Sequence, residues 1–183
     1  MVEKNNRAVF IDRDGVLVKT NVIDGKSYAV RSLNNFDIFP EATAALTTLK
    51  SNGYLVIVVT NQPDVGNKLI KKSVIEAMHT KLTSELLIDA IFTCYHRQNE
   101  GCICRKPKPG MLLEAAANHH IDLSKSFMIG DRKSDIDAGQ AVGCYSIFID
   151  RDYVEPKPIN PDGIVKDIKE ASNLINKFVK CHA

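Results

Sequence analysis

The sequence predicts a doubly wound α/β fold built on a mostly parallel β-sheet. Short apolar runs rich in Val, Ile and Phe recur along the chain, and they lack the polar alternation of strands with one solvated face. Segments with the apolar spacing of helices lie between these runs. Alternating strands and helices favour a parallel sheet that is covered by helices on both faces, with right-handed crossovers.

Five apolar runs are predicted to form the buried strands. Each run is too short for a typical helix and ends at polar or turn-forming residues. In chain order the predicted strands are Ala8–Ile11, Tyr54–Val59, Ala90–Thr93, Phe127–Ile129 and Cys144–Ile149.

Four segments between or after these runs have helical spacing. Their apolar positions are Ala42, Ala45, Leu46 and Leu49; Val74, Ala77, Met78 and Leu82; Met111, Leu112, Ala115 and Ala116; and Ile136, Ala138, Ala141 and Val142. Gly53 and Gly143 follow the first and last of these helices, where glycine commonly ends a helix. Residues 166–180 are predicted to form a surface helix after a proline-rich connecting loop.

Length and composition predict a single globular domain. The chain has 183 residues, of which 44% are hydrophobic and 25% charged, and its formal net charge is +2. We expect a core of about residues 7–150, followed by a loop and helix over 151–183. The lysines and arginines are scattered, which argues against a nucleic-acid partner. No run reaches the roughly 18–20 apolar residues of a membrane span, and a signal-peptide pattern is absent, so we expect a cytoplasmic monomer without a membrane partner.

Polar residues follow the first predicted strand where ligands bind in doubly wound folds. Asp12 and Asp14 come directly after that strand, and residues two apart in an extended chain point the same way, so Arg13 is expected to point elsewhere. Paired carboxylates suit Mg²⁺ and can act as nucleophile and as acid/base. Taken alone, the pair also fits a solvated loop.

Three further strand ends carry polar residues that could complete the same site. Thr60, Asn61 and Gln62 follow the second strand, and their hydroxyl and amide groups could bind a phosphoryl oxygen or merely shape the turn. Lys106 lies in a rigid basic turn after the third strand. Asp131 and Asp135 follow the fourth strand at a helix start, where they could bind a metal or cap the helix.

In this order, these residues resemble the four motifs of the haloacid dehalogenase superfamily of phosphohydrolases, over roughly residues 7–150. The resemblance implies its Rossmann-like fold, an in-line attack on phosphorus by Asp12, and proton transfer by Asp14. It also implies that Thr60 and Lys106 hold the phosphoryl group of the substrate, a small-molecule phosphate ester. We further expect Asn61, Gln62, Arg105 and Arg132 to contact the substrate. Mg²⁺ would be bound by Asp12, the Asp14 carbonyl and Asp131, with Asp135 in support.

A loop after the third strand carries the ligand types of a structural zinc site. Cys94, His96, Cys102 and Cys104 supply three thiols and an imidazole within a short stretch, which matches a closed tetrahedral Zn²⁺ site. Free cytosolic thiols are the alternative. The odd total of five cysteines does not fit a secreted disulfide framework.

The combined pattern resembles the branch of this superfamily that contains D-glycero-D-manno-heptose 1,7-bisphosphate phosphatase and histidinol-phosphate phosphatase. Members of that branch lack a large cap domain, and here the insertions after Asp14 and Asn61 are short. A heptose bisphosphate is the first expectation for the substrate and histidinol phosphate the second. A nucleic-acid end is a weaker third hypothesis, and a catalytically silent binding module is disfavoured by the intact motifs. Residues 61–68 and the shorter zinc loop depart from the heptose enzymes near the substrate entrance, so the substrate stays open.

Overall fold

The computed structural model describes residues 5–181 and contains a six-stranded, fully parallel sheet at its centre. The strand order is β5-β4-β1-β6-β7-β8. The strands are β1 (Arg7–Ile11), β4 (Tyr54–Asn61), β5 (Ala90–Cys94), β6 (Phe127–Gly130), β7 (Tyr145–Ile149) and β8 (Gly163–Val165). The predicted doubly wound fold is confirmed, and the chain adds β8 as an edge strand that was not predicted.

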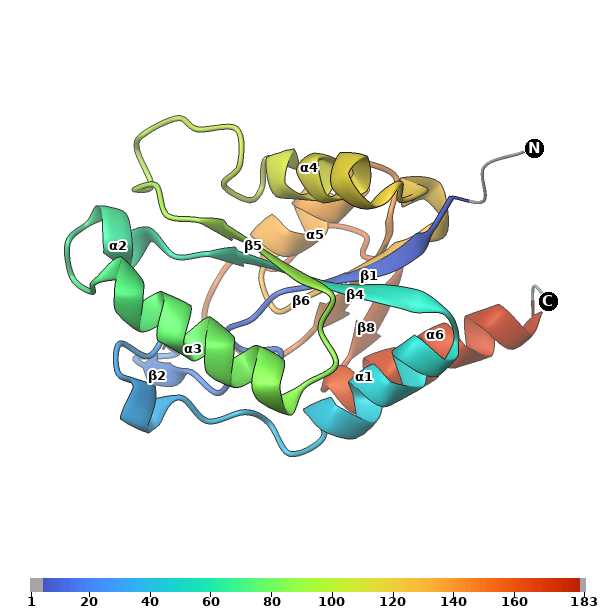
Figure 1. The fold of residues 1–183 in the computed structure, drawn as a ribbon, viewed down its shortest axis with the longest axis horizontal. Coiled ribbons are helices and arrows are strands. Elements are labelled where there is room, and N and C mark those ends of the chain that lie inside the picture. The colour runs from blue at the N-terminus through green and yellow to red at the C-terminus, as the bar shows by residue number, and fades with distance from the viewer. Residues whose placement is uncertain (1–4, 182–183) are drawn as a thin grey trace.

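Helices cover both faces of the sheet (Figure 1). One face is covered by α1 (Ala42–Ser51), α3 (Lys72–Glu85) and α6 (Ile168–Cys181), and the other by α4 (Gly110–His119) and α5 (Lys133–Gln140). Alternate residues of β1 point to opposite faces: Val9 and Ile11 belong to the first core cluster, and Ala8 and Phe10 to the second. Burial on both faces explains why the predicted strands read as continuous apolar runs.

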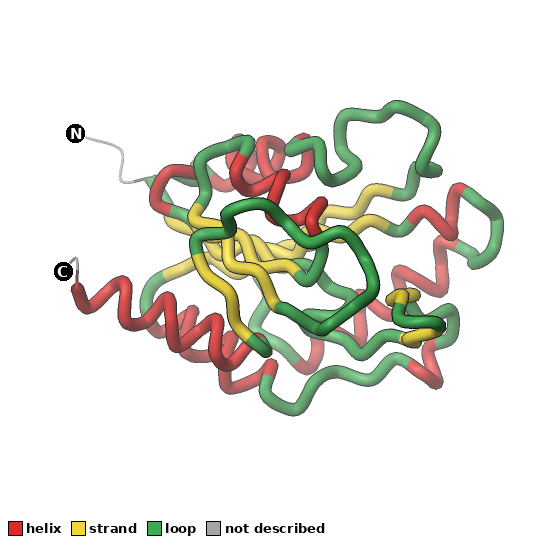
Figure 2. The backbone as a smooth tube through the Cα atoms, turned by 180° about the vertical axis from the view of Figure 1, so that it is seen from behind, coloured by secondary structure: helices red, strands yellow, loops and turns green. Residues whose placement is uncertain are grey.

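Smaller elements connect the strands and helices at both ends of the sheet. The chain between β1 and α1 forms a hairpin of β2 (Asn21–Ile23) and β3 (Lys26–Tyr28), which we call the flap, and then the 3₁₀ helix η1 (Leu33–Asn35). Figure 2 shows the flap as two short strands beyond one end of the main sheet. The one-turn α2 (Pro63–Gly66) follows β4, and the 3₁₀ helix η2 (Leu123–Lys125) precedes β6. Neither insertion forms a separate cap layer among the described residues.

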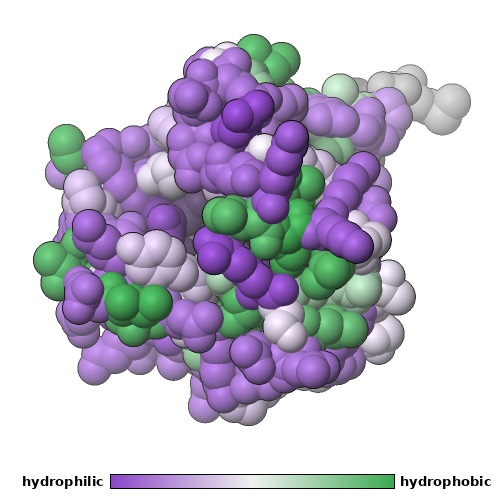
Figure 3. Space-filling model, turned by 90° about the vertical axis from the view of Figure 1, so that its left-hand side faces the viewer, coloured by the Kyte–Doolittle hydropathy of each residue, from purple (hydrophilic) through white to green (hydrophobic). Residues whose placement is uncertain are grey.

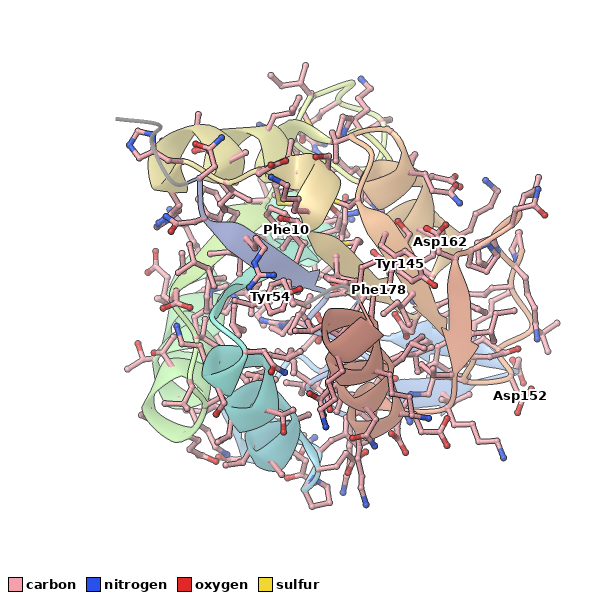
Figure 4. The ribbon with its side chains drawn as sticks, turned by 90° about the vertical axis from the view of Figure 1, so that its right-hand side faces the viewer. Phe10, Tyr54, Tyr145, Asp152, Asp162 and Phe178 are labelled. Atoms are coloured by element: carbon pink, nitrogen blue, oxygen red, sulfur yellow. The ribbon has the colours of Figure 1, made fainter. Side chains whose placement is uncertain are left out.

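The opposite end of the sheet carries an aromatic cluster. Tyr54, Phe127 and Tyr145 start their strands, and Phe127 contacts both tyrosine rings at centroid distances of 5.6 and 5.5 Å. Figure 4 shows Tyr54 and Tyr145 near Phe178 of α6. The cavity of about 750 Å³ beside this cluster is lined by none of the residues that the sequence predicts for the site.

Within residues 5–181, none of the helices combines the length and the apolar character that a bilayer span requires.

Candidate active site and metal centres

The chain adds strands to one side of β1 as far as β5 and then to its other side from β6 onward. The predicted site residues meet at this change of side. β4 lies on one side of β1 and β6 on the other, so the residues that follow these three strands face a common crevice. A cavity of about 650 Å³ opens at this end of the sheet. Its lining includes most of the predicted residues: Asp12, Asp14, Asn61, Gln62, Arg105, Lys106, Arg132 and Asp135. Figure 3 shows the hollowed, largely hydrophilic surface at this end.

Lys106 links two of the predicted carboxylates inside the protein. Its Nζ lies 2.7 Å from Asp12 Oδ1, 2.7 Å from Asp135 Oδ1 and 2.7 Å from the Val59 carbonyl oxygen. Burial acts to lower the pKa of Lys106, but the charges of Asp12 and Asp135 outweigh it and raise this pKa overall. The lysine is therefore a permanent positive charge beside Asp12.

Asp12 and Asp131 lie in a buried environment that disfavours their negative charge. Burial raises the pKa of Asp12 to about 7, although Lys106 opposes this shift. Burial, followed by the charges of Asp12 and Asp135, also raises the pKa of Asp131 well above its usual value. Asp131 is 2% exposed, and neither of its carboxylate oxygens has a hydrogen-bond partner. A buried carboxylate without partners costs free energy, so this geometry fits a bound cation.

Asp12, Asp131 and Asp135 offer oxygens that all lie within 4.8 Å of one another. Oxygen ligands at such spacing are those that Mg²⁺ prefers. Gly15 makes the approach of Asp131 possible: it adopts φ +85°, and a Cβ at this position would lie 1.9 Å from Asp131 Oδ2. Any side chain at residue 15 would therefore displace Asp131.

Asn61 and Gln62 mainly contact other site residues. Asn61 Nδ2 donates to the Lys106 carbonyl at 3.1 Å and its Oδ1 accepts from the Lys106 amide at 3.1 Å, which fixes the loop that carries the lysine. Gln62 Nε2 donates to Asp14 Oδ2 at 2.7 Å and to Thr60 Oγ1 at 2.9 Å. Both side chains thus order the site, and their contacts with substrate stay a prediction.

The two predicted arginines differ in their partners. Arg132 donates to the Ser27 carbonyl in the flap and lies 3.5 Å from Glu155 Oε2. Arg105 lines the cavity, and its buried NH1 atom has no hydrogen-bond partner. Arg105 thus lines the cavity with a donor that has no partner in the described structure. Glu155 was missed by sequence reasoning because it lies in a loop, far along the chain from the flap.

Arg13 does not point away from the acidic pair, which corrects the expectation from strand alternation. The chain turns directly after Asp12, since the amides of Leu17 and Val18 donate to the Arg13 carbonyl. The rule for extended residues therefore no longer applies at Arg13. Its guanidinium donates to Asp14 through Nε at 3.1 Å and through NH2 at 3.0 Å.

The four predicted zinc ligands form a second cluster beside the first. Cys94, His96, Cys102 and Cys104 offer ligand atoms that all lie within 4.8 Å of one another. Cys104 Sγ is 3.2 Å from both Cys94 Sγ and His96 Nδ1, and Cys94 Sγ is 3.6 Å from Cys102 Sγ. These separations are too long for a disulfide and fit the edges of a tetrahedron around one small cation.

Known proteins share this fold and sequence pattern. A family model described as "HAD-hyrolase-like" matches residues 103–171. The D-glycero-beta-D-manno-heptose-1,7-bisphosphate 7-phosphatase of Pseudomonas aeruginosa is 32% identical over 77% of this chain and 79% of its own length. The protein of the same name from Helicobacter pylori strain J99 is 36% identical over 73% of this chain and 77% of its own. The chain therefore belongs to the haloacid dehalogenase-like hydrolases.

Two further comparisons concern a longer protein and the fold. The histidine biosynthesis bifunctional protein HisB of Campylobacter jejuni strain 81116 is 35% identical over 72% of this chain, which spans 38% of that longer protein. The crystal structure of the D,D-heptose 1.7-bisphosphate phosphatase of B. bronchiseptica, complexed with magnesium and phosphate, superposes with a TM-score of 0.81. It covers 94% of this chain and 99% of its own at 24% identity, a likeness that concerns the fold.

Proposed function

We propose that the protein is a Mg²⁺-dependent phosphatase that removes the 7-phosphate of D-glycero-β-D-manno-heptose 1,7-bisphosphate by way of a phospho-Asp12 intermediate. The observation that carries this proposal is the buried group of Asp12, Lys106 and Asp131, in which Lys106 pairs with Asp12 while both carboxylate oxygens of Asp131 lack a partner. The names of several relatives at 31–36% identity supply the substrate.

Asp12 is the nucleophile in this scheme. One of its carboxylate oxygens attacks the phosphorus, and the bond between phosphorus and the sugar oxygen breaks. Lys106 neutralises charge on the phosphoryl oxygens and the Thr60 hydroxyl orients them by a hydrogen bond, because phosphoryl transfer depends mainly on positioning and on charge stabilisation. Mg²⁺, when bound by Asp12, the Asp14 carbonyl and Asp131, with Asp135 in support, would supply further positive charge at this point.

Asp14 moves the protons. In the first step its carboxylic acid gives a proton to the departing sugar oxygen. In the second step its carboxylate takes a proton from the water that attacks the phosphorus of phospho-Asp12, which releases phosphate and restores both aspartates. One carboxyl group can serve both steps since each leaves it in the form that the other needs.

The cavity suits a substrate with two phosphates. A cavity of about 650 Å³ is large enough for a sugar bisphosphate. If one phosphate lies at Asp12, the other needs a separate cation at the cavity wall, and Arg105, which lines the cavity and has a donor without a partner, is the cation we assign to it. The Zn²⁺ cluster ends at Cys104, next to Arg105, so a bound zinc would hold this arginine at the entrance.

The test is phosphate release in the presence of Mg²⁺ from heptose 1,7-bisphosphate, histidinol phosphate and a 5′-phosphorylated oligonucleotide. We expect the highest kcat/KM for the heptose bisphosphate, with ³¹P spectra showing loss of the 7-phosphate. Asp12→Asn should lose more than about a hundredfold in kcat, because an amide is a poor nucleophile, whereas Asp24→Asn in the exposed flap turn should match wild type. A preference for histidinol phosphate, suggested by the HisB relative, would overturn the substrate assignment, and an active Asp12→Asn variant would overturn the mechanism.

A further inference from the structure

We propose that Arg13 and His79 are positioning residues that hold the carboxylate of Asp14 in the orientation it needs for proton transfer. The inference rests on the acid/base role proposed above for Asp14. His79 belongs to α3, far from the four motifs in sequence, and neither residue takes part in the phosphoryl transfer described above.

The Asp14 carboxylate accepts hydrogen bonds from two side chains, those of Arg13 and Gln62. The Arg13 side chain is 0% exposed, and its Nε and NH2 atoms approach the two carboxylate oxygens as a fork. Gln62 Nε2 adds a third hydrogen bond at 2.7 Å. A bidentate guanidinium fixes a carboxylate in plane and direction, which a single point charge cannot do.

His79 in turn fixes Arg13. Arg13 NH1 lies 3.2 Å from His79 Nε2. Arginine has donors only, so Nε2 must be the acceptor and the imidazole must carry its proton on Nδ1. Burial, followed by the charge of Arg13, lowers the pKa of His79 to about 4, so the ring is neutral near pH 7 and can accept this bond.

The support behind His79 is rigid. α3 is anchored by Ile75, Met78 and Leu82, which are all buried in the core. The Phe36 ring lies 5.4 Å from the Arg13 guanidinium carbon and occupies another side of it. The guanidinium is therefore held by a helix, a ring and a carboxylate, and the helix is connected to Asp14 through two hydrogen-bonded contacts.

This arrangement matters because Asp14 has to reach two different oxygens in turn. It would protonate the sugar oxygen in one step and accept a proton from water in the next, and both lie on the same side of the phosphorus. A carboxylate that rotated freely would be aligned for proton transfer for only part of the time. Part of the rate gain from general acid/base catalysis, which is typically about 10²–10⁴, would then be lost. A purely structural role, in which Arg13 only stabilises the turn, predicts a different set of effects.

Substrates with different leaving groups separate the two roles. The departing oxygen of a sugar phosphate needs a proton, whereas p-nitrophenolate leaves without one, so only the first depends on Asp14 in the first step. We would measure release of the leaving group in the first turnover by rapid quench, for the sugar phosphate and for p-nitrophenyl phosphate, in Arg13→Lys, His79→Leu, His79→Gln and, as reference, Asp14→Asn.

We expect Arg13→Lys and His79→Leu to slow the first turnover of the sugar phosphate by about tenfold or more while changing that of p-nitrophenyl phosphate less than about threefold. His79→Gln should recover most of the rate, since its amide oxygen can accept from Arg13 NH1. Equal losses on both substrates, or failure of glutamine to rescue, would overturn the inference.

The controls separate this inference from the proposed function. If Asp14→Asn shows no dependence on the leaving group, then Asp14 is not the acid and both proposals about it fall. If Asp14→Asn shows the dependence but the Arg13 and His79 variants do not, only the positioning role is wrong. Should His79→Leu fail to fold, as judged by thermal unfolding, Arg13→Lys decides the question.

Discussion

Lys106 illustrates how one residue can serve both the fold and the chemistry. A lysine that is 2% exposed is rare and is tolerated only with paired charges. Here it lies between Asp12 and Asp135, and the Asn61 side chain holds its backbone from both sides. The lysine thus joins the ends of β1, β4 and α5 at the point where the phosphate is proposed to bind.

Replacing Lys106 by methionine should destabilise the fold as well as abolish turnover. The substitution leaves the carboxylates of Asp12 and Asp135 buried without their cation, and breaking a buried ion pair costs about 3–5 kcal/mol. Urea unfolding in the presence of chelator measures this loss. Lys108→Met is the matched control, because Lys108 is exposed in the same loop and its Nζ contacts only the Gly101 carbonyl in the described structure; a similar loss in both variants would contradict the expectation.

Arg105 should govern substrate choice and have little effect on the reaction itself. The Arg105 side chain lines the cavity, and its NH1 atom has no hydrogen-bond partner, so a small movement of the guanidinium would let it bind a distal phosphate. Arg105→Ala should lower kcat/KM for a sugar bisphosphate by more than about tenfold, equivalent to about 1.4 kcal/mol, and hardly alter an aryl phosphate. Arg97→Ala, in an exposed pair with Glu100, serves as control. Equal losses on both substrates would place Arg105 at the transferring phosphate instead.

Among the larger elements, the flap depends on contacts with residues far along the chain. Glu155 Oε1 accepts from the Ser27 amide at 3.1 Å, and its other oxygen faces Arg132 at 3.5 Å. The Gly25 carbonyl accepts from the Val154 amide at 2.8 Å. A two-stranded hairpin is marginally stable by itself, so the loop that contains Val154 and Glu155 helps to hold the flap beside the site.

Glu155→Gln should loosen the flap without disturbing the sheet. The amide keeps an acceptor but loses the charge that pairs with Arg132, so we expect faster hydrogen exchange in residues 21–28 and a KM raised several-fold, with a smaller change in kcat. Glu114→Gln on the exposed surface of α4 is the control. Unchanged exchange in the flap would show that the backbone bonds alone hold it.

The zinc loop should behave as an element whose local order depends on its metal. Three thiols and an imidazole converge there, and the binding energy of a structural zinc is also folding energy. Protein purified without chelator should contain one zinc per chain by elemental analysis, and Cys102→Ser should lose it. Cys144→Ser removes a buried thiol outside the cluster and should keep the metal. Zinc-free protein with freely reactive thiols at the cluster would refute this prediction.

At the scale of the whole molecule, the sequence predicted the parts whose signals are local. Continuous apolar runs and helical spacing indicated five of the six strands of the main sheet and its larger helices, and the polar residues after β1, β4 and β6 indicated a common site. The flap was not predicted because its strands, Asn21–Ile23 and Lys26–Tyr28, are too short and too exposed to show a hydrophobic pattern. The contacts of Arg13 with His79 and of Arg132 with Glu155 escaped because they depend on how distant segments pack, which single-residue patterns do not encode.

The stability of the whole protein should depend on Mg²⁺ if the carboxylate cluster binds it. Asp131 is buried with two unpaired oxygens beside Asp12, so ion binding to the folded state relieves a cost that the unfolded chain does not have. At a free Mg²⁺ concentration about 100 times its Kd, the free energy of unfolding should rise by about 2.7 kcal/mol. Thermal unfolding across a Mg²⁺ series measures this rise. Asp131→Asn should abolish it, whereas Asp152→Asn should not, since Asp152 is exposed and its backbone, at φ 57°, suits asparagine. A Mg²⁺ response that survives in Asp131→Asn would place the ion elsewhere and would remove Asp131 from the proposed metal site.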